Sequence, residues 1–271
     1  MNYLADARPT TLTEIGRMRA EGEKIVMLTA YDASFASLEE RCGVNVILVG
    51  DSLGNVIQGH ASTLPVTMEN MVYHTECTAR GTHRAFLVAD LPFGTYQESP
   101  EQALRNAARL LAAGAQMVKL EGGEVMAETV RFLVERGVPV CAHIGLTPQS
   151  VHQLGGYKVQ GRTEDSVERL KREARALEQA GAALLVLEMV TRGVATDITA
   201  ATIDMATIGI GAGPETHGQV LVLHDLIGVF PGKRPRFAKD FVGGTRTVEQ
   251  AIRAYVEDVK AARFPAPEHC Y

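Results

Sequence analysis

Five short apolar segments, each followed by an ionisable residue, constrain the fold of this chain more than any other feature of its sequence. Strands that are covered on both faces read as nearly continuous apolar runs, whereas half-exposed strands alternate apolar and polar residues. The segments are of the first kind, so they predict a buried parallel sheet whose strands deliver polar groups to one site. They are residues 46–49, 86–89, 117–120, 140–142 and 184–187, and they lead into Asp51, Asp90, Glu121, His143 and Glu188.

The length and composition favour one large α/β domain over residues 1–271. The chain is 46% hydrophobic and has no Pro/Ser-rich linker that would divide it. The net charge of -5 gives no electrostatic reason to bind nucleic acid or an anionic membrane. We therefore expect small molecules as its partners, rather than a phosphate-rich polymer or a lipid surface.

The cysteines and the N-terminus predict a cytoplasmic protein. The four cysteines show no close pairing and no Cys-x-x-Cys motif, so neither a disulfide framework nor a structural zinc site is indicated. Residues 1–9 lack the basic start and apolar stretch of a signal peptide, and no run of about 18 apolar residues follows.

The order of helix and strand signals predicts a parallel (β/α)8 barrel with a short N-terminal helix. Thr11 and Glu14 have the spacing of a capping box for that helix, which Gly22 ends. An open, doubly wound sheet could hold the same elements, but barrel closure is what brings successive strand ends together. The predicted strands are residues 25–30, 46–51, 86–90, 117–121, 140–143, 184–188, 207–213 and 220–225, and the clearest helices are residues 67–80, 125–136, 164–179 and 248–262.

Three carboxylates at neighbouring strand ends predict a magnesium site. Asp51, Asp90 and Glu121 offer hard oxygen ligands with no thiol beside them, which suits Mg²⁺. Side chains alternate along a strand, so Lys119 lies on the same face as Glu121. The alternative interpretation is a structural network between the acids and Lys119.

Three further features of the predicted mouth leave alternatives open. Glu188 is a candidate general base, although a salt-bridged glutamate would give the same pattern. His143 can stabilise developing negative charge or bond a backbone carbonyl. The basic stretch Lys233, Arg234, Arg236 and Lys239 can contact an anionic tail or a subunit, or it can be a solvated loop.

The long loop of residues 145–162 predicts a lid or binding loop.

The glycine-rich segment of residues 209–213 does not fit a dinucleotide-binding loop. A Gly-x-Gly-x-x-Gly motif starting at Gly209 needs a glycine where the chain has Pro214, and no helix start follows. We expect the glycines to allow a close backbone approach at the barrel mouth.

Several long motifs, in matching order, resemble the ketopantoate hydroxymethyltransferase family over about residues 11–259. The motifs are LTAYD at 28–32, VGDSLG at 49–54, STLPVT at 62–67, VKLEG at 118–122, AHIGLTPQ at 142–149 and IGIGAG at 208–213. The resemblance implies an enzyme that transfers a hydroxymethyl group from 5,10-methylenetetrahydrofolate to 3-methyl-2-oxobutanoate through a Mg²⁺-stabilised enolate. The product is 2-dehydropantoate (ketopantoate), a precursor of pantothenate. The resemblance also implies a homodecamer of two pentameric rings.

The resemblance also assigns roles to individual residues. It implies that Asp51 and Asp90 bind the metal directly, beside the chelated oxoacid, and that Glu121 holds a water on the metal. Ser52 and Lys119 are implied to contact the oxoacid. By the same resemblance His143 lies beside the oxoacid and Glu188 is the base.

Three positions depart from the family pattern, and a related enzyme group offers an alternative function. Thr191 replaces a proline, His217 an acid and His60 an aromatic residue, so we expect effects on rate and oxoacid choice. The alternative is a Mg²⁺-dependent lyase or mutase of the phosphoenolpyruvate mutase/isocitrate lyase group, but residues 145–162 lack the cysteine such lyases usually carry. A noncatalytic metabolite-binding barrel is a further alternative.

Overall fold

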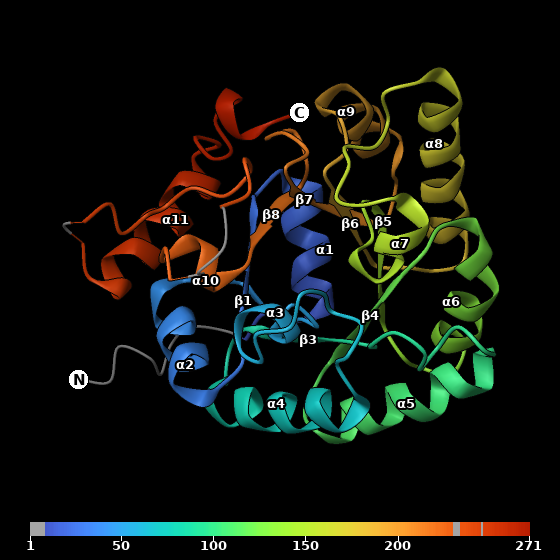
Figure 1. Cartoon of the computed structure of the whole chain (residues 1–271), viewed down its shortest axis with the longest axis horizontal. Coiled ribbons are helices and arrows are strands. Elements are labelled where there is room, and N and C mark those ends of the chain that lie inside the picture. Colours follow the sequence, from blue (N-terminus) through green and yellow to red (C-terminus); the bar gives the residue numbers. More distant parts are fainter. Residues whose placement is uncertain (1–8, 230–233, 245) are drawn as a thin grey trace.

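The computed structural model describes residues 9–229, 234–244 and 246–271, and its centre is a closed barrel of parallel strands (Figure 1). Each strand pairs with the next, and β1 pairs with β8 to close the ring. The predicted (β/α)8 barrel is confirmed. The strands are β1 (Ile25–Thr29), β2 (Val46–Val49), β3 (Phe86–Asp90), β4 (Met117–Glu121), β5 (Val140–Gly145), β6 (Leu184–Glu188), β7 (Ala206–Ile210) and β8 (Gly218–Leu221).

The longer helices surround the barrel, and local signals set their ends. In α1 (Leu12–Glu21) the Thr11 side chain accepts a hydrogen bond from the Glu14 backbone N–H, and Gly22 ends the helix in the left-handed region, as predicted. Arg19 of α1 donates to the Thr202 carbonyl just before β7, so α1 is fixed at the N-terminal end of the barrel. The other long helices are α2 (Ala33–Cys42), α4 (Met68–Gly81), α5 (Pro100–Ala112), α6 (Ala127–Val134), α8 (Glu164–Gln179), α9 (Arg192–Ala201) and α11 (Val248–Lys260).

The last strand and several helices differ from the sequence prediction. The strand predicted at residues 220–225 was wrong at both ends: β8 starts at Gly218, and residues 223–226 form the short helix α10 (Leu223–Leu226). The chain turns there because the Leu223 N–H donates to Thr29 Oγ1 of β1 rather than continuing the sheet. The short helix α7 (Val151–Leu154) lies inside the loop predicted at residues 145–162, and the short helix α3 (Leu53–Val56) follows β2, where no helix was predicted.

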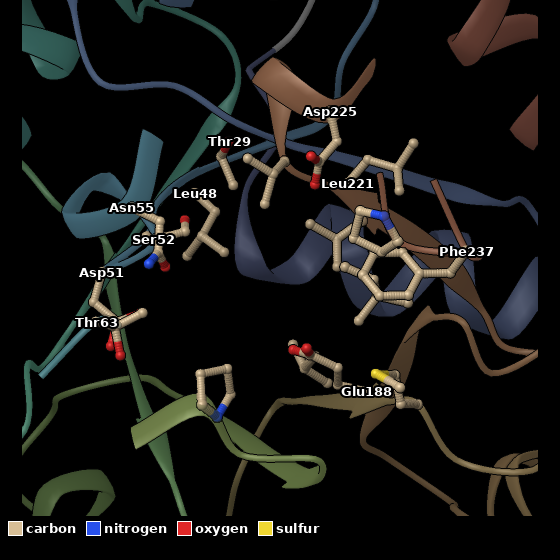
Figure 2. A pocket seen from close by; sticks show the side chains of 18 of the residues that line it. Thr29, Leu48, Asp51, Ser52, Asn55, Thr63, Glu188, Leu221, Asp225 and Phe237 are labelled. Atoms are coloured by element: carbon tan, nitrogen blue, oxygen red, sulfur yellow. The ribbon is translucent and has the colours of Figure 1, made fainter. Parts of the chain in front are cut away.

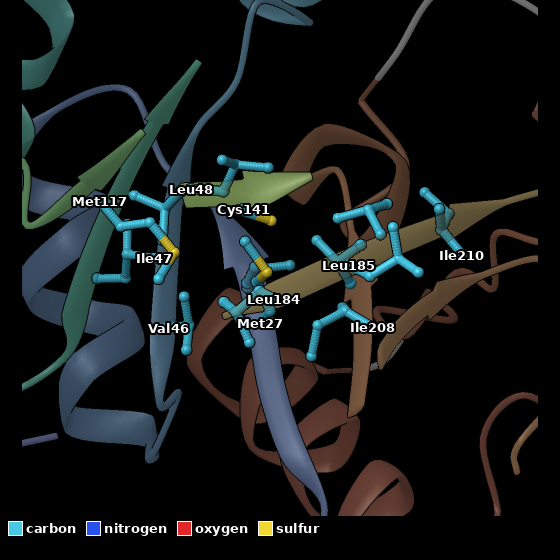
Figure 3. Close-up of a cluster of buried hydrophobic side chains, with 14 of the residues drawn as sticks. Met27, Val46, Ile47, Leu48, Met117, Cys141, Leu184, Leu185, Ile208 and Ile210 are labelled. Carbon is cyan, nitrogen blue, oxygen red and sulfur yellow. The ribbon is translucent and has the colours of Figure 1, made fainter. Parts of the chain in front are cut away.

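Apolar side chains fill the barrel below its C-terminal end (Figure 3). Met27, Met117, Cys141, Leu184 and Ile208 are completely buried and come from strands all around the ring. The C-terminal strand ends therefore provide the one open end where polar groups can gather. In the part of the chain with described structure, no helix is both long and apolar enough to cross a membrane. Residues 1–9, which the sequence predicts not to be a signal peptide, lie outside the described residues except for Pro9.

Candidate active site

A cavity of about 570 Å³ opens at the C-terminal mouth of the barrel (Figure 2). The sequence predicted that the strand-end residues would converge, and the structure confirms it. The cavity is lined by every predicted site residue: Asp51, Ser52, Asp90, Lys119, Glu121, His143 and Glu188.

A buried lysine lies among the acids on one side of the cavity. Lys119 Nζ is 3.1 Å from Asp90 Oδ1 and 3.9 Å from Glu121 Oε1, and the strand register places Lys119 directly beside Asp90. Burial lowers the pKa of Lys119, but the surrounding carboxylates raise it more, so the net shift is upward. Lys119 is therefore a permanent positive charge inside the site.

Asp51 has the most strongly perturbed carboxyl group of this acid cluster. Burial, together with the negative charges of Asp90 and Glu121, raises its pKa to about 8. Its backbone N–H donates to Asp90 Oδ2 at 3.0 Å, which holds the two acids side by side. Lys119 supplies one ammonium against these three carboxyl groups.

His143 lies between two carboxylates. Its Nδ1 is 3.3 Å from Glu121 Oε1 and its Nε2 is 3.4 Å from Glu188 Oε2, although neither buried ring nitrogen has an aligned hydrogen-bond partner. Burial and the Lys119 ammonium lower the pKa of His143, but the two carboxylates raise it more, to about 9. His143 therefore links the acid cluster to Glu188 by charge.

Gln149, which sequence reasoning assigned no role, holds the acid cluster together. Its backbone N–H donates to Glu121 Oε2, and its Nε2 donates to Asp51 Oδ2, both at 2.9 Å. Tyr96, equally unassigned, donates its hydroxyl to Gln149 Oε1 at 2.6 Å and accepts from the Glu121 N–H at 3.1 Å. Nothing in the local sequence distinguishes these two residues, and only the motif at 142–149 drew attention to Gln149.

Ser52 begins the short helix α3 and presents its hydroxyl beside the acids. Its Oγ lies 2.9 Å from the hydroxyl of Tyr31, so the two groups share one hydrogen bond. Gly50 makes room for this arrangement, because a Cβ at that position would lie only 2.7 Å from Ser52 Oγ. Ser52 keeps further hydrogen-bonding capacity for a ligand in the cavity.

The donor set suits a divalent cation that prefers oxygen, although it is not a complete protein-made cage. No group of three or more His, Cys, Asp or Glu side chains among the described residues is arranged to hold an ion by itself. However, Asp90 Oδ1 is buried with only the 3.1 Å ion pair to Lys119 among the described residues, and Asp51 has a raised pKa. Mg²⁺ commonly takes one or two carboxylates and completes its shell with water and substrate oxygens. Asp51 and Asp90 fit that pattern, with Glu121 held farther back by His143 and Gln149.

Asp225, which lies beyond the predicted set, also belongs to this mouth. Figure 2 shows Asp225 and Glu188 pointing into the cavity, from α10 and from the end of β6. The sequence prediction placed Asp225 in a strand and gave it no role. Of the predicted basic stretch, Arg234 and Arg236 line the cavity, and Lys233 lies outside the described residues.

Comparison with solved structures supports the fold. Over 94% of this chain and 99% of the other, the structure resembles phosphonopyruvate hydrolase, solved as a complex with oxalate and Mg²⁺, with a TM-score of 0.60 and 14% identity. It also resembles 2,3-dimethylmalate lyase, a member of the PEP mutase/isocitrate lyase superfamily, over 79% of this chain and 81% of the other, with a TM-score of 0.57 and 19% identity. At such identities the likeness concerns the barrel alone.

Comparison with sequences identifies the family. The chain is 70% identical to 3-methyl-2-oxobutanoate hydroxymethyltransferase of Azoarcus sp. (strain BH72), with both chains covered completely. It is 59% identical to 3-methyl-2-oxobutanoate hydroxymethyltransferase 1 of Burkholderia ambifaria, again over both full chains. The model of the family described as ketopantoate hydroxymethyltransferase matches residues 9–267. The chain therefore belongs to the ketopantoate hydroxymethyltransferase family.

Proposed function

We propose that the cavity transfers a hydroxymethyl group from 5,10-methylenetetrahydrofolate to 3-methyl-2-oxobutanoate and so produces ketopantoate. The observation that carries this proposal is the arrangement of two chemically different sides of one cavity. Asp51, Asp90 and Lys119 supply charged oxygen and ammonium groups on one side, and Glu188 faces them from β6. A 2-oxoacid needs both: a polar clamp for its oxygens and a base for the proton on the next carbon.

Asp51 and Asp90 would hold Mg²⁺, and Glu121 would reach it through a water molecule. When bound there, Mg²⁺ draws electron density from a ketone and makes the neighbouring C–H more acidic. Gln149 fixes Asp51 and Glu121 in place, so the two carboxylates need little rearrangement on binding. Burial and the charges of Asp90 and Glu121 raise the pKa of Asp51, and a cation bound there would lower it.

The remaining polar residues act on the oxoacid itself. Ser52 and Lys119 bind its oxygens, and the fixed charge of Lys119 stabilises negative charge that develops there as the proton leaves. Glu188 removes the C3 proton. His143, 3.4 Å from Glu188, orients that carboxylate toward the oxoacid. The folate enters from the side of the cavity lined by α10 and residues 234–237. The carbanionic C3 then forms a bond to its methylene carbon as one carbon–nitrogen bond of that carbon breaks. A water molecule supplies the hydroxyl oxygen as the second carbon–nitrogen bond breaks, and tetrahydrofolate leaves.

One reaction tests the proposal. Purified protein is incubated with Mg²⁺, 3-methyl-2-oxobutanoate and 5,10-methylenetetrahydrofolate, and ketopantoate is measured by mass spectrometry. We expect product that depends on all three components. A protein that forms no ketopantoate with any divalent metal would contradict the proposal and favour a metabolite-binding barrel. Release of a shorter oxoacid from a larger substrate would instead favour the lyase group.

A further inference from the structure

The strongest unassigned feature of the cavity is the carboxylate of Asp225. Asp225 is only 7% exposed and lines the cavity, yet its carboxylate receives no hydrogen bond from any described residue. The acids across the cavity differ, since Asp51 accepts from Gln149 and Glu121 accepts from the Gln149 backbone. Arg234, whose charge acts on Asp225, is itself paired with Asp240 at 3.0 Å. Within the described parts of the chain, Asp225 is thus a hydrogen-bond acceptor without a donor.

The charge state of Asp225 makes it an acceptor at neutral pH. Burial raises the pKa of Asp225 to about 6, with Arg234 lowering it and Glu188 raising it further. The group is therefore mostly ionised at pH 7 to 8, when both of its oxygens accept hydrogen bonds and neither donates. A partly buried carboxylate without donors costs folding free energy, so a ligand that supplies donors gains affinity there.

The walls around Asp225 are apolar and partly aromatic. Figure 2 shows Phe237 and Leu221 beside Asp225 at the same end of the cavity, and both are nearly buried. Ile210 and Met189 extend this apolar lining toward β6. An apolar slot with one carboxylate selects a flat ring whose edge carries two adjacent N–H donors, because a carboxylate accepts two parallel hydrogen bonds. A 2-amino-4-oxopyrimidine ring has such an edge in its 2-amino group and neighbouring N3–H.

We propose that Asp225 is the residue that binds the pterin ring of the folate, accepting hydrogen bonds from its 2-amino group and N3–H while the ring lies against Phe237. This inference rests on the proposed folate-dependent function. Arg236, which donates to the Glu268 carbonyl, lies on the same side of the cavity, so the anionic glutamate end of a folate meets positive charge there. The oxoacid side of the cavity, with Asp51 and Glu188, takes no part in this recognition.

The test measures binding rather than turnover. Tetrahydrofolate is titrated calorimetrically into the protein with Mg²⁺ and oxoacid present, for the unchanged chain, Asp225→Asn and Asp225→Ala. We expect both variants to bind about 10²-fold more weakly, as for the loss of hydrogen bonds to a charged group. Asp197→Asn is the matched control, because it removes a surface acid that pairs with Lys171 outside the cavity lining. It should bind tetrahydrofolate normally.

A second ligand tests which edge of the pterin ring Asp225 recognises. A tetrahydrofolate analogue that lacks the 2-amino group should bind the unchanged chain at least about 10-fold more weakly than tetrahydrofolate, because one acceptor loses its donor. The Asp225→Ala variant should bind the two ligands equally. Equal discrimination by the unchanged chain and by Asp225→Ala would overturn the inference.

Exchange of the oxoacid C3–H for deuterium without folate separates this inference from the proposed function. Both Asp225 variants should exchange within about twofold of the unchanged chain, since Asp225 does not bind the oxoacid. Exchange that falls together with folate binding would show that Asp225 supports the whole site, and would overturn the inference. An unchanged chain that exchanges but does not bind tetrahydrofolate would overturn the folate assignment and this inference together. Normal folate binding by both variants would overturn this inference alone.

Discussion

Of the two glutamates that lie beside His143 at the mouth, Glu188 is the less restrained. The Glu121 side chain is 3% exposed and is fixed by Gln149, whereas the Glu188 side chain is 15% exposed and has His143 as its charged neighbour at 3.4 Å. A group that must take a proton from a bound substrate needs such access. A group that must hold a cation in place needs the tighter restraint.

The assignment of Glu188 as the base can be checked without folate. With Mg²⁺ present, the unchanged chain should exchange the C3–H of 3-methyl-2-oxobutanoate for deuterium, as followed by proton NMR. Glu188→Gln keeps the size of the side chain but removes the base, so the exchange rate should fall about 10²- to 10⁴-fold while oxoacid binding survives. If the variant exchanges at the unchanged rate, His143 becomes the first candidate for the base.

Substitution of either proposed metal ligand should reduce Mg²⁺ binding, whereas Glu188→Gln should reduce proton exchange. Asp51→Asn and Asp90→Asn should each weaken Mg²⁺ binding strongly in calorimetric titrations with oxoacid present, because each removes a carboxylate from the only side of the cavity rich in oxygen donors. Both variants should keep their circular dichroism spectra. Unchanged Mg²⁺ affinity in both would contradict the metal assignment.

The sequence predicted the charged residues of this site better than the residues that position them. A carboxylate directly after a buried strand must face the barrel mouth, so Asp90, Glu121 and Glu188 could be located from chain order alone. Gln149 and Tyr96 could not, because their partners are up to 98 positions away in the chain. Asp225 was missed because the turn into α10 depends on a hydrogen bond to Thr29 of β1.

Among the strands, the pair β7 and β8 forms the shortest ladder of the barrel, and His217 reinforces it. Only Ile208 and Gly209 pair with β8, at its first two residues. His217 Nδ1 accepts a hydrogen bond from the Thr207 backbone N–H at 3.0 Å, which extends the contact between the two strands. An acid, which the family resemblance implies at this position, can accept the same bond, so histidine preserves the contact only while the imidazole is neutral.

This replacement predicts a pH-dependent stability. Burial, with a smaller effect of Arg19 and Lys24, lowers the pKa of His217 to about 4 in the folded chain. The unfolded chain binds this proton near pH 6.5, so the folded state loses stability as pH falls from about 6.5 to about 4. In urea unfolding, the free energy of unfolding should therefore fall less with pH for His217→Asp than for the unchanged chain. The expected difference is about 1–2 kcal/mol, a figure reduced because His217 is partly exposed to solvent. Parallel stability curves for the two proteins between pH 7 and 4.5 would contradict the prediction.

The helices show which elements can be predicted from local signals. In α8 the capping box of Thr163 and Ser166 fixes the first residue, and the predicted span of 164–179 matches the structure. Helix α9 was not predicted, since its sequence contains Gly193 and several β-branched residues and its N-cap Thr191 makes no side-chain capping bond. Packing against α8 and β7 forms that helix, and such packing is invisible in a local window.

At the level of the assembly, the structure bears on where the subunits of the expected decamer could contact each other. The Ala/Leu-rich face of α5 does not supply a subunit interface, because Ala103, Ala107 and Leu110 are buried and belong to the core. Exposed apolar side chains lie elsewhere, notably Tyr73 at 62% exposure and Val125 at 87%. The proposed decamer thus rests on the family.

Sedimentation in dilute buffer tests the assembly directly. We expect a particle much larger than a dimer, since the proposed assembly contains ten chains of 29.2 kDa. Raising the salt concentration serves as a control, because an assembly held by apolar contacts should persist. A monomer at all protein concentrations would contradict the decamer.

The contacts of Gln149 have a consequence for the order in which this protein acquires its site. The acids come from β2, β3 and β4, but the side chain that fixes Asp51 and the backbone that fixes Glu121 lie beyond β5. On a ribosome, the first half of the chain therefore emerges with Lys119 among these acids but without the Gln149 groups that donate to Asp51 and Glu121. We expect these two carboxylates to be fixed only after residues near position 149 have been synthesised, so the mouth is completed late although its acids are made early.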